Sequence, residues 1–227
     1  MKIALFWPCG QIGRAVLQKL IAGGDYVYLY TDDADGCKAD CTACEVVCGR
    51  MDDPEAMQRA VRAADAVVCC VDAVLGRRKD RTTPHSDGLS AVFAAMRACG
   101  KSRIFIAAPA CGEGPSERSG MLRVFGRLFH SFAPHMYRDA DALLEAVRGS
   151  GLRYTVIRYL NPFLKHSRGG YVLAEEGEKI KAGGSTENLF RAMAHAVQSS
   201  KLRWRLQDDS LDALTAEEVF YMATKGG

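Results

Sequence analysis

The sequence predicts an α/β domain with a parallel, doubly wound sheet and helices on both faces of that sheet. Two features of the chain carry this prediction. Short apolar runs bounded by turn residues recur over about the first 160 residues, and longer segments with a helical apolar period lie between them. Strands that alternate regularly with helices form parallel sheets, because a parallel connection has to cross back over the sheet.

The first strand–helix–strand unit has the clearest pattern. Residues 2–6 form a continuous apolar run, which is typical of a strand buried on both faces. Residues 10–23 carry Ile12 and Val16 on one helical face and end in a glycine pair, which predicts an amphipathic helix with a glycine stop. Residues 26–30, YVYLY, are rich in β-forming residues and predict the second strand.

The same alternation continues along the chain. Further strands are predicted at residues 45–48, 66–71, 103–108 and 154–158. Further helices are predicted at residues 54–64, 85–99, 139–147, 187–198 and 216–224. Pro54 suits a first helical turn, and Gly100 supplies a stop. No repeat or linker interrupts the pattern, so we expect residues 1–227 to form one domain, in which about residues 160–227 contribute a smaller, substrate-side region.

Composition and charge exclude several classes of protein. Apolar residues make up 48% of the chain and charged residues 25%, as in ordinary globular proteins. The net charge of +3 is too small to indicate a nucleic-acid partner, and no apolar stretch reaches the ~20 residues of a membrane span. The opening MKIALF is too short for the core of a signal peptide. We therefore expect a cytoplasmic protein, a monomer or homodimer, that acts on an unidentified small molecule.

Cysteine is unusually frequent, with nine in the chain, and four of them fall within twelve residues: Cys37, Cys41, Cys44 and Cys48. A zinc or iron–sulfur site needs thiolates that converge on one point, usually from C-x2-C knuckles. Only Cys41 and Cys44 have that spacing, and no second knuckle follows. Buried reduced cysteines also behave as small hydrophobic side chains. We expect no metal site, with metal binding by the four cysteines as the alternative.

The turn after the first strand, WPCGQIG, lies where a nucleotide-binding sheet carries its glycine-rich phosphate turn. Such a turn lets the backbone approach a pyrophosphate, and the following helix N-terminus favours its charge. Gly10 and Gly13 are kept, whereas Trp7 replaces the first glycine and Pro8 removes a backbone donor. The turn predicts either a nucleotide site in which the indole covers or walls the adenosine end, or a tight turn that binds nothing.

Acidic residues follow the second strand. An acidic residue ~20 positions past the glycines typically holds the ribose hydroxyls of NAD, whereas a nearby arginine accommodates the phosphate of NADP. Asp32 and Asp33 stand at that distance with no basic residue beside them. If a dinucleotide binds, NAD(H) is therefore favoured over NADP(H). The alternative is a solvated acidic loop.

Segments spread over nearly the whole chain carry a family resemblance. They are MKIALF, GQIG, VLQKLIAGG, EVVCGRMDDPEAMQRAVRAADAVVCCV, DGLSAVFAAMRACGKSRIFIAA, RDADALLEAVRGSGLRYTVIR and STENLFRAMAHAVQ. With them the chain resembles the atypical short-chain dehydrogenase/reductase group with a single NAD(P)H-binding domain. That group includes NmrA-like regulators and relatives of NADH-flavin and biliverdin-IXβ reductases. The resemblance implies a Rossmann-like fold.

The resemblance also implies which residues surround the cofactor. They are Trp7, Pro8, Gly10, Gln11, Ile12, Gly13, Asp32, Arg50, Met51, Val71 and Ala108. Several of these positions depart from the family pattern. Arg50 corresponds to an acidic residue beside the adenine, and Ala108 and Pro109 correspond to a serine pair after the fifth strand. Such changes on an otherwise well-matched scaffold suggest a changed or lost ligand.

The catalytic residues of the wider group are poorly matched. Tyr137 is the one tyrosine near the segment that carries the acid of a Ser-Tyr-Lys reductase, but Asp141 stands where the lysine is needed. Flavin reduction needs no protein acid, because the hydride passes between stacked rings. We expect an NAD(P)H-dependent oxidoreductase of flavin- or quinone-reductase type with a remodelled cofactor site and flavin as a candidate substrate. The alternative is a non-catalytic NmrA-like sensor or interaction protein on the same scaffold.

Overall fold

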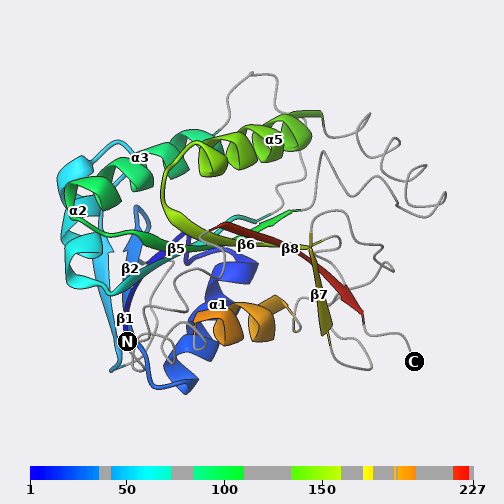
Figure 1. The fold of residues 1–227 in the computed structure, drawn as a ribbon. Helices are drawn as coiled ribbons and strands as arrows, with labels where there is room; N and C mark the ends of the chain where they lie inside the picture. The colour runs from blue at the N-terminus through cyan, green and yellow to red at the C-terminus, as the bar shows by residue number, and fades with distance from the viewer. Residues whose placement is uncertain are drawn as a thin grey trace, which may run out of the picture.

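The computed structural model describes residues 1–35, 42–72, 84–109, 134–159, 171–175, 187, 189–197 and 217–224. Within these residues, strands and helices alternate along the chain (Figure 1). The strands are β1 (Lys2–Phe6), β2 (Tyr26–Thr31), β3 (Cys44–Cys48), β4 (Ala66–Cys70), β5 (Arg103–Pro109), β6 (Arg153–Tyr159), β7 (Tyr171–Glu175) and β8 (Glu217–Thr224). The labelled helices are α1 (Gln11–Ala22), α2 (Pro54–Ala63), α3 (Pro84–Ala98) and α5 (Pro134–Arg148). Residues 189–197 are also helical.

All eight strands belong to one sheet, in the order β3-β2-β1-β4-β5-β6-β8-β7. Neighbouring strands are parallel from β3 to β8, and β7 runs antiparallel to β8 at the edge. The chain starts at β1, moves outward to β3, and then returns to β4 on the other side of β1. This reversal of strand order places the ligand crevice of a doubly wound sheet at the carboxyl ends of β1 and β4. The predicted fold class is confirmed.

Helices cover both faces of the sheet (Figure 1). On one face α2, α3 and α5 pack over the strands through buried side chains such as Leu89 and Leu143. On the other face α1 and the helix at 189–197 contribute Leu20 and Met193 to a second cluster. Because both faces are covered, the central strands are apolar along their whole length. None of the described helices combines the length and apolar character needed to cross a membrane.

Local residues set where two of the helices begin. Asp53 caps α2, because its carboxylate accepts a hydrogen bond from the Ala56 amide at 2.9 Å, and Pro54 fills the first helical position. Gly10 precedes α1 and has no side chain that could cap it. The first amides of α1 therefore depend on an acceptor from elsewhere.

The end of the chain differs from the sequence prediction. The helix predicted at residues 216–224 is wrong, because Glu217–Thr224 form β8 between β6 and β7. In the register Val219 lies beside Val156 and Phe220 beside Ile157, so this β-branched and aromatic stretch pairs in the sheet. Sheet pairing outweighs the helical spacing of its apolar residues. The pattern also missed β7, and it started the helix α5 at Asp139 rather than at Pro134.

The burial of β4 predicts a position-dependent loss of stability. Val68 in β4 is fully buried, whereas Val46 in β3 is 38% exposed. We expect Val68→Ala to lower the free energy of unfolding by about 2 kcal/mol, because it removes buried methyl groups and leaves a cavity. Val46→Ala is the matched control and should change it by less than about 0.5 kcal/mol. Urea denaturation followed by circular dichroism measures both, and equal losses would contradict the central position of β4.

Candidate functional site

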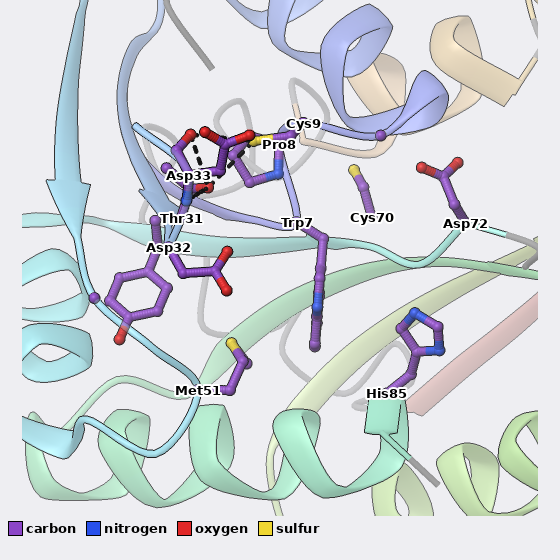
Figure 2. Close-up of a pocket in the computed structure, with 13 residues that line it drawn as sticks. Trp7, Pro8, Cys9, Thr31, Asp32, Asp33, Met51, Cys70, Asp72 and His85 are labelled. Atoms are coloured by element: carbon purple, nitrogen blue, oxygen red, sulfur yellow. Dashed lines mark hydrogen bonds between the residues drawn. The ribbon is translucent and has the colours of Figure 1, made fainter. Parts of the chain in front are cut away.

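A cavity of about 340 Å³ lies at the carboxyl ends of β1, β2 and β4. Figure 2 shows the side chains that surround it. The lining residues are Trp7, Pro8, Cys9, Gly10, Tyr30, Thr31, Asp32, Asp33, Gly49, Met51, Cys70, Asp72 and His85. The cavity therefore occupies the crevice in which doubly wound sheets bind their ligands.

The turn between β1 and α1 is packed too closely for any side chain at Gly13. A Cβ atom there would overlap the Trp7 carbonyl oxygen and lie 2.8 Å from the Pro8 Cα. Real Cβ atoms essentially never come so close to backbone atoms, so a substitution would force the turn to move. Gly13 thus lets the start of α1 lie directly against the end of β1.

Trp7 stands in the cavity with an unusual backbone conformation. Its φ of 56° lies in the left-handed region, which costs a residue other than glycine roughly 1–2 kcal/mol. The indole packs on α3, where a Cβ atom added to Gly88 would lie 2.9 Å from it, and meets the His85 ring edge-on at 5.9 Å between centroids. In Figure 2 it separates Asp32 on one side from Asp72 on the other. The indole forms a wall between two halves of the cavity.

On the β2 side, Thr31 joins two segments of the chain. Its Oγ1 accepts a hydrogen bond from the Asp33 amide at 3.0 Å and lies 3.2 Å from the Cys9 sulfur. These contacts hold the end of β2 against the β1–α1 turn. The Asp32 carboxylate extends into the cavity toward Trp7 (Figure 2). This half of the cavity therefore presents carboxylates beside an aromatic wall.

Tyr30 fixes the turn between β3 and α2. Its hydroxyl donates a hydrogen bond to the Arg50 carbonyl oxygen at 2.6 Å. Burial, followed by the nearby Asp53 carboxylate, raises the pKa of Tyr30 to about 12, so the hydroxyl keeps its proton at neutral pH. The turn directs Met51 toward the cavity. The Arg50 side chain is 79% exposed and pairs with Asp52 at 3.1 Å.

Asp72 follows β4 and places its carboxylate at the N-terminus of α1. The Ile12 amide donates a hydrogen bond to Asp72 Oδ1 at 3.1 Å. A Cβ atom at Gly10 would overlap the same carboxylate, so the missing side chain makes room for it. Burial raises the pKa of Asp72 and outweighs the opposing effects of the Ile12 and Gln11 amides and of His85. The acceptor that α1 needs is thus supplied by the protein itself.

His85 lies at the edge of the cavity and is held by Asp139 of α5. Its Nδ1 is 2.7 Å from Asp139 Oδ2, and the Ser86 amide donates to Asp139 Oδ1 at 3.0 Å. Burial acts to raise the pKa of Asp139, but the hydrogen bonds from His85 and from the Ser86 amide prevail, and the pKa is lowered. The pair fixes the imidazole beside Trp7 and Asp72 (Figure 2).

Some of the residues that the sequence predicts for cofactor binding line the cavity. Trp7, Pro8, Gly10, Asp32 and Met51 line it. The remaining predicted residues, Gln11, Ile12, Gly13, Arg50, Val71 and Ala108, are not among its lining residues. Of these, Gln11 and the Arg50 side chain are exposed and the other four residues are buried. Their roles toward a cofactor stay predictions.

Sequence reasoning missed Asp72 and the pair His85 and Asp139. Asp72 had a local signal, because it directly follows an apolar run whose carboxyl end faces the crevice. The pair of His85 and Asp139 had no local signal in the sequence, because the two residues lie 54 positions apart. They meet only through the packing of α3 on α5.

The remaining candidates of the sequence analysis do not contribute to the described site. The side chain of Tyr137 lies outside the described residues, as do Cys37 and Cys41. Cys44 and Cys48 both lie in β3, where Cys44 is half-buried and Cys48 is exposed. Among the described residues, no group of three or more histidine, cysteine, aspartate or glutamate side chains is arranged to hold a metal ion.

Comparison with known families agrees with this architecture. Residues 9–204 match the sequence model of the NAD(P)H-binding family, which covers most of the chain. The chain therefore belongs to the NAD(P)H-binding family. Its Rossmann-like fold is similar to that of a solved short-chain dehydrogenase/reductase from Veillonella parvula. No curated protein matches the sequence.

Several solved structures share the fold over the full chain. A short-chain dehydrogenase/reductase from Veillonella parvula in complex with NADP has a TM-score of 0.75 at 17% identity, covering 99% of this chain and 95% of its own. A candidate NADH-flavin reductase from Streptococcus pneumoniae has a TM-score of 0.72 at 14% identity, with coverages of 99% and 100%. An anaerobillin reductase from Escherichia coli O157:H7 has a TM-score of 0.70 at 14% identity and covers 100% of both chains. At such identities the likeness shows the fold.

The Asp139 carboxylate should make a pH-dependent contribution to the free energy of unfolding. Because its folded-state pKa lies below the ordinary value of 3.8, its stabilising effect is complete above that value and is lost as the pH falls through the lowered pKa. We expect Asp139→Asn to cost about 1–3 kcal/mol at pH 7, and less once the pH is below about 4.

Urea denaturation at pH 7 and pH 3 measures this difference. Asp52→Asn is the control, because the Asp52 side chain is 74% exposed and its ion pair lies at the surface. A loss of stability in Asp139→Asn that is the same at both pH values would contradict the stabilising role of the charge.

Proposed function

We propose that this protein is an NAD(P)H-dependent oxidoreductase of flavin- or quinone-reductase type that favours NAD(H) over NADP(H). The observation that carries the proposal is the cavity at the carboxyl ends of β1, β2 and β4 in a chain of the NAD(P)H-binding family. The names of two structural relatives, an NADH-flavin reductase candidate and an anaerobillin reductase, support the reaction class.

The β2 side of the cavity fits the adenosine part of a dinucleotide. Asp32 and Asp33 offer carboxylate acceptors for ribose hydroxyls, and neither lysine nor arginine is among the described lining residues to bind a ribose phosphate. Met51 offers an apolar surface against which a base can pack. This chemistry favours NAD(H).

The diphosphate part does not fit while Asp72 keeps its observed position. The carboxylate already accepts from the Ile12 amide, and the start of this helix is where the fold binds a diphosphate. Two anions cannot share that place. We therefore expect a dinucleotide to bind more weakly here than to a turn without such a carboxylate.

The chemistry then divides between the cofactor and the protein. A bound NAD(P)H supplies the hydride, and the protein supplies binding and orientation. Trp7 walls the cavity, and the imidazole of His85, fixed by Asp139, lies at its edge. Flavin is a candidate substrate because its reduction needs no protein acid.

A second function is favoured by the changed positions themselves. In a non-catalytic NmrA-like sensor or interaction protein, the cavity would bind a dinucleotide without turnover or bind none. The Asp72 carboxylate at α1 supports this alternative, and so do Ala108 and Pro109, which bring no hydroxyl to the end of β5.

Titration with NADH, followed by its fluorescence, tests the proposal. We expect saturable binding of NADH and weaker binding of NADPH. Asp32→Ser should weaken NADH binding on the order of tenfold, because a hydrogen bond to a charged group is lost, and should not weaken NADPH binding. Asp52→Ser, on the exposed β3–α2 turn, is the matched control.

The same proteins are then assayed for NADH oxidation with a flavin or a quinone as acceptor. Absence of saturable NADH binding up to millimolar concentration would contradict the reductase proposal. Saturable binding without turnover of either acceptor would favour the sensor.

The wall formed by Trp7 predicts an effect of removing it. Trp7→Gly removes the wall between the two halves of the cavity. Glycine also adopts the φ of 56° at this position without steric strain. We expect the variant to bind NADH more tightly, on the order of tenfold or ~1.4 kcal/mol. Trp7→Phe keeps an aromatic ring and serves as the control. An affinity that is unchanged in Trp7→Gly would refute obstruction by the indole.

A further inference from the structure

We infer that Asp72 is a built-in competitor of the cofactor diphosphate and sets the affinity of the site for ligands that carry one. The inference rests on the proposed function, because it concerns ligand binding in the same cavity. Asp72 lies outside the set of cofactor-binding residues that the sequence predicts, and the part of the ligand that it opposes is the diphosphate.

The competition is for the first amides of α1. This helix has no capping side chain at Gly10, so its amides need an acceptor, and the Ile12 amide takes Asp72 Oδ1 at 3.1 Å. In a doubly wound sheet these amides are the donors that bind a diphosphate. One N–H cannot serve both acceptors fully, so a diphosphate has to displace the carboxylate.

Steric overlap and like-charge repulsion both oppose the binding of a phosphate beside Asp72. The volume left by the missing side chain of Gly10 is the volume through which a phosphate would approach, and the Asp72 carboxylate fills it. A phosphate that entered beside the carboxylate would meet a like charge in a partly buried place, where repulsion is stronger than in water. Asp32 and Asp33 add two further carboxylates to the same cavity.

The backbone directly before Asp72 is held in place. Val71 is fixed by two hydrogen bonds, from its amide to the Ala107 carbonyl at 2.9 Å and from the Tyr159 hydroxyl to its own carbonyl at 2.8 Å. The backbone leading to Asp72 is thus anchored, so we expect an exchange to move the side chain of Asp72 rather than β4. Burial raises the pKa of Asp72, so desolvation disfavours the charged form in this position.

Asp72 should not weaken the binding of a ligand that carries no phosphate. Adenosine reaches only the β2 side of the cavity, which the Trp7 wall separates from Asp72 (Figure 2). NADH has to occupy the start of α1 as well. Comparing these two ligands therefore isolates the contribution of the diphosphate.

Isothermal titration of NADH and of adenosine into the wild type and Asp72→Asn tests the inference. We expect Asp72→Asn to bind NADH at least about tenfold more tightly, or ~1.4 kcal/mol, with the affinity for adenosine unchanged. Asp65→Asn is the matched control, because it removes the same charge at the opposite end of the strands, where Asp65 accepts from the Lys2 amide. It should change neither affinity.

Thermal unfolding gives a second readout. Because Asp72 caps α1, Asp72→Asn should lower the melting temperature of the free protein, and NADH should raise it by more than it raises that of the wild type. Asp72→Ser keeps a short polar side chain and replaces the asparagine variant if that variant does not fold.

Three outcomes would overturn the inference, and they can be told apart. If NADH binds equally well to the wild type and Asp72→Asn, Asp72 is no competitor, although the proposed function stands. If the affinity for adenosine rises by the same factor as that for NADH, the effect is not directed at the diphosphate. If NADH binds to neither protein, the inference and the proposed function fail together.

Discussion

The hydrogen bond between the Ile12 amide and the Asp72 carboxylate ties together the two strands at the centre of the sheet. It joins the helix that follows β1 to the residue that follows β4, across the crevice where the strand order reverses. Other features of the site depend on this contact. The missing side chain of Gly10 leaves room for the carboxylate, and the carboxylate in turn lines the β4 side of the cavity. The space beside Gly10 is thus occupied by a carboxylate of the same chain.

The packing of the sheet and the lining of the cavity depend largely on different residues. The two apolar clusters on the faces of the sheet are built from side chains such as Leu89 and Met193, which lie in helices on opposite faces. The cavity is lined by residues at strand ends and turns, which the packing of the faces constrains less. A change among these lining residues can therefore alter what binds while the packing of the two faces stays the same. This separation explains how one fold can serve different ligands.

The sequence was sufficient for most of the fold because strand and helix periods are local properties. The first unit, residues 2–30, follows the pattern closely, since buried parallel strands are continuously apolar and glycines stop the helix. It was insufficient for β8, where pairing with β6 decides the conformation of a stretch whose own spacing suits a helix. The site shows the same limit. Gly10 could be predicted because it belongs to the turn after the first strand, and Asp32 because it follows the second strand, whereas His85 and Asp139 meet only in the folded chain.

The position of Trp7 gives the protein an optical reporter of its own. The chain has two tryptophans, and this one stands between the two halves of the cavity with its ring edge-on to His85. Indole emission depends on the polarity and the quenching groups around the ring, and a protonated imidazole is such a group. A ligand on either side changes those surroundings, and reduced nicotinamide also absorbs in the range where tryptophan emits. Occupancy of the cavity can therefore be followed by intrinsic fluorescence without a label, with Trp7→Phe to separate its signal from that of Trp204.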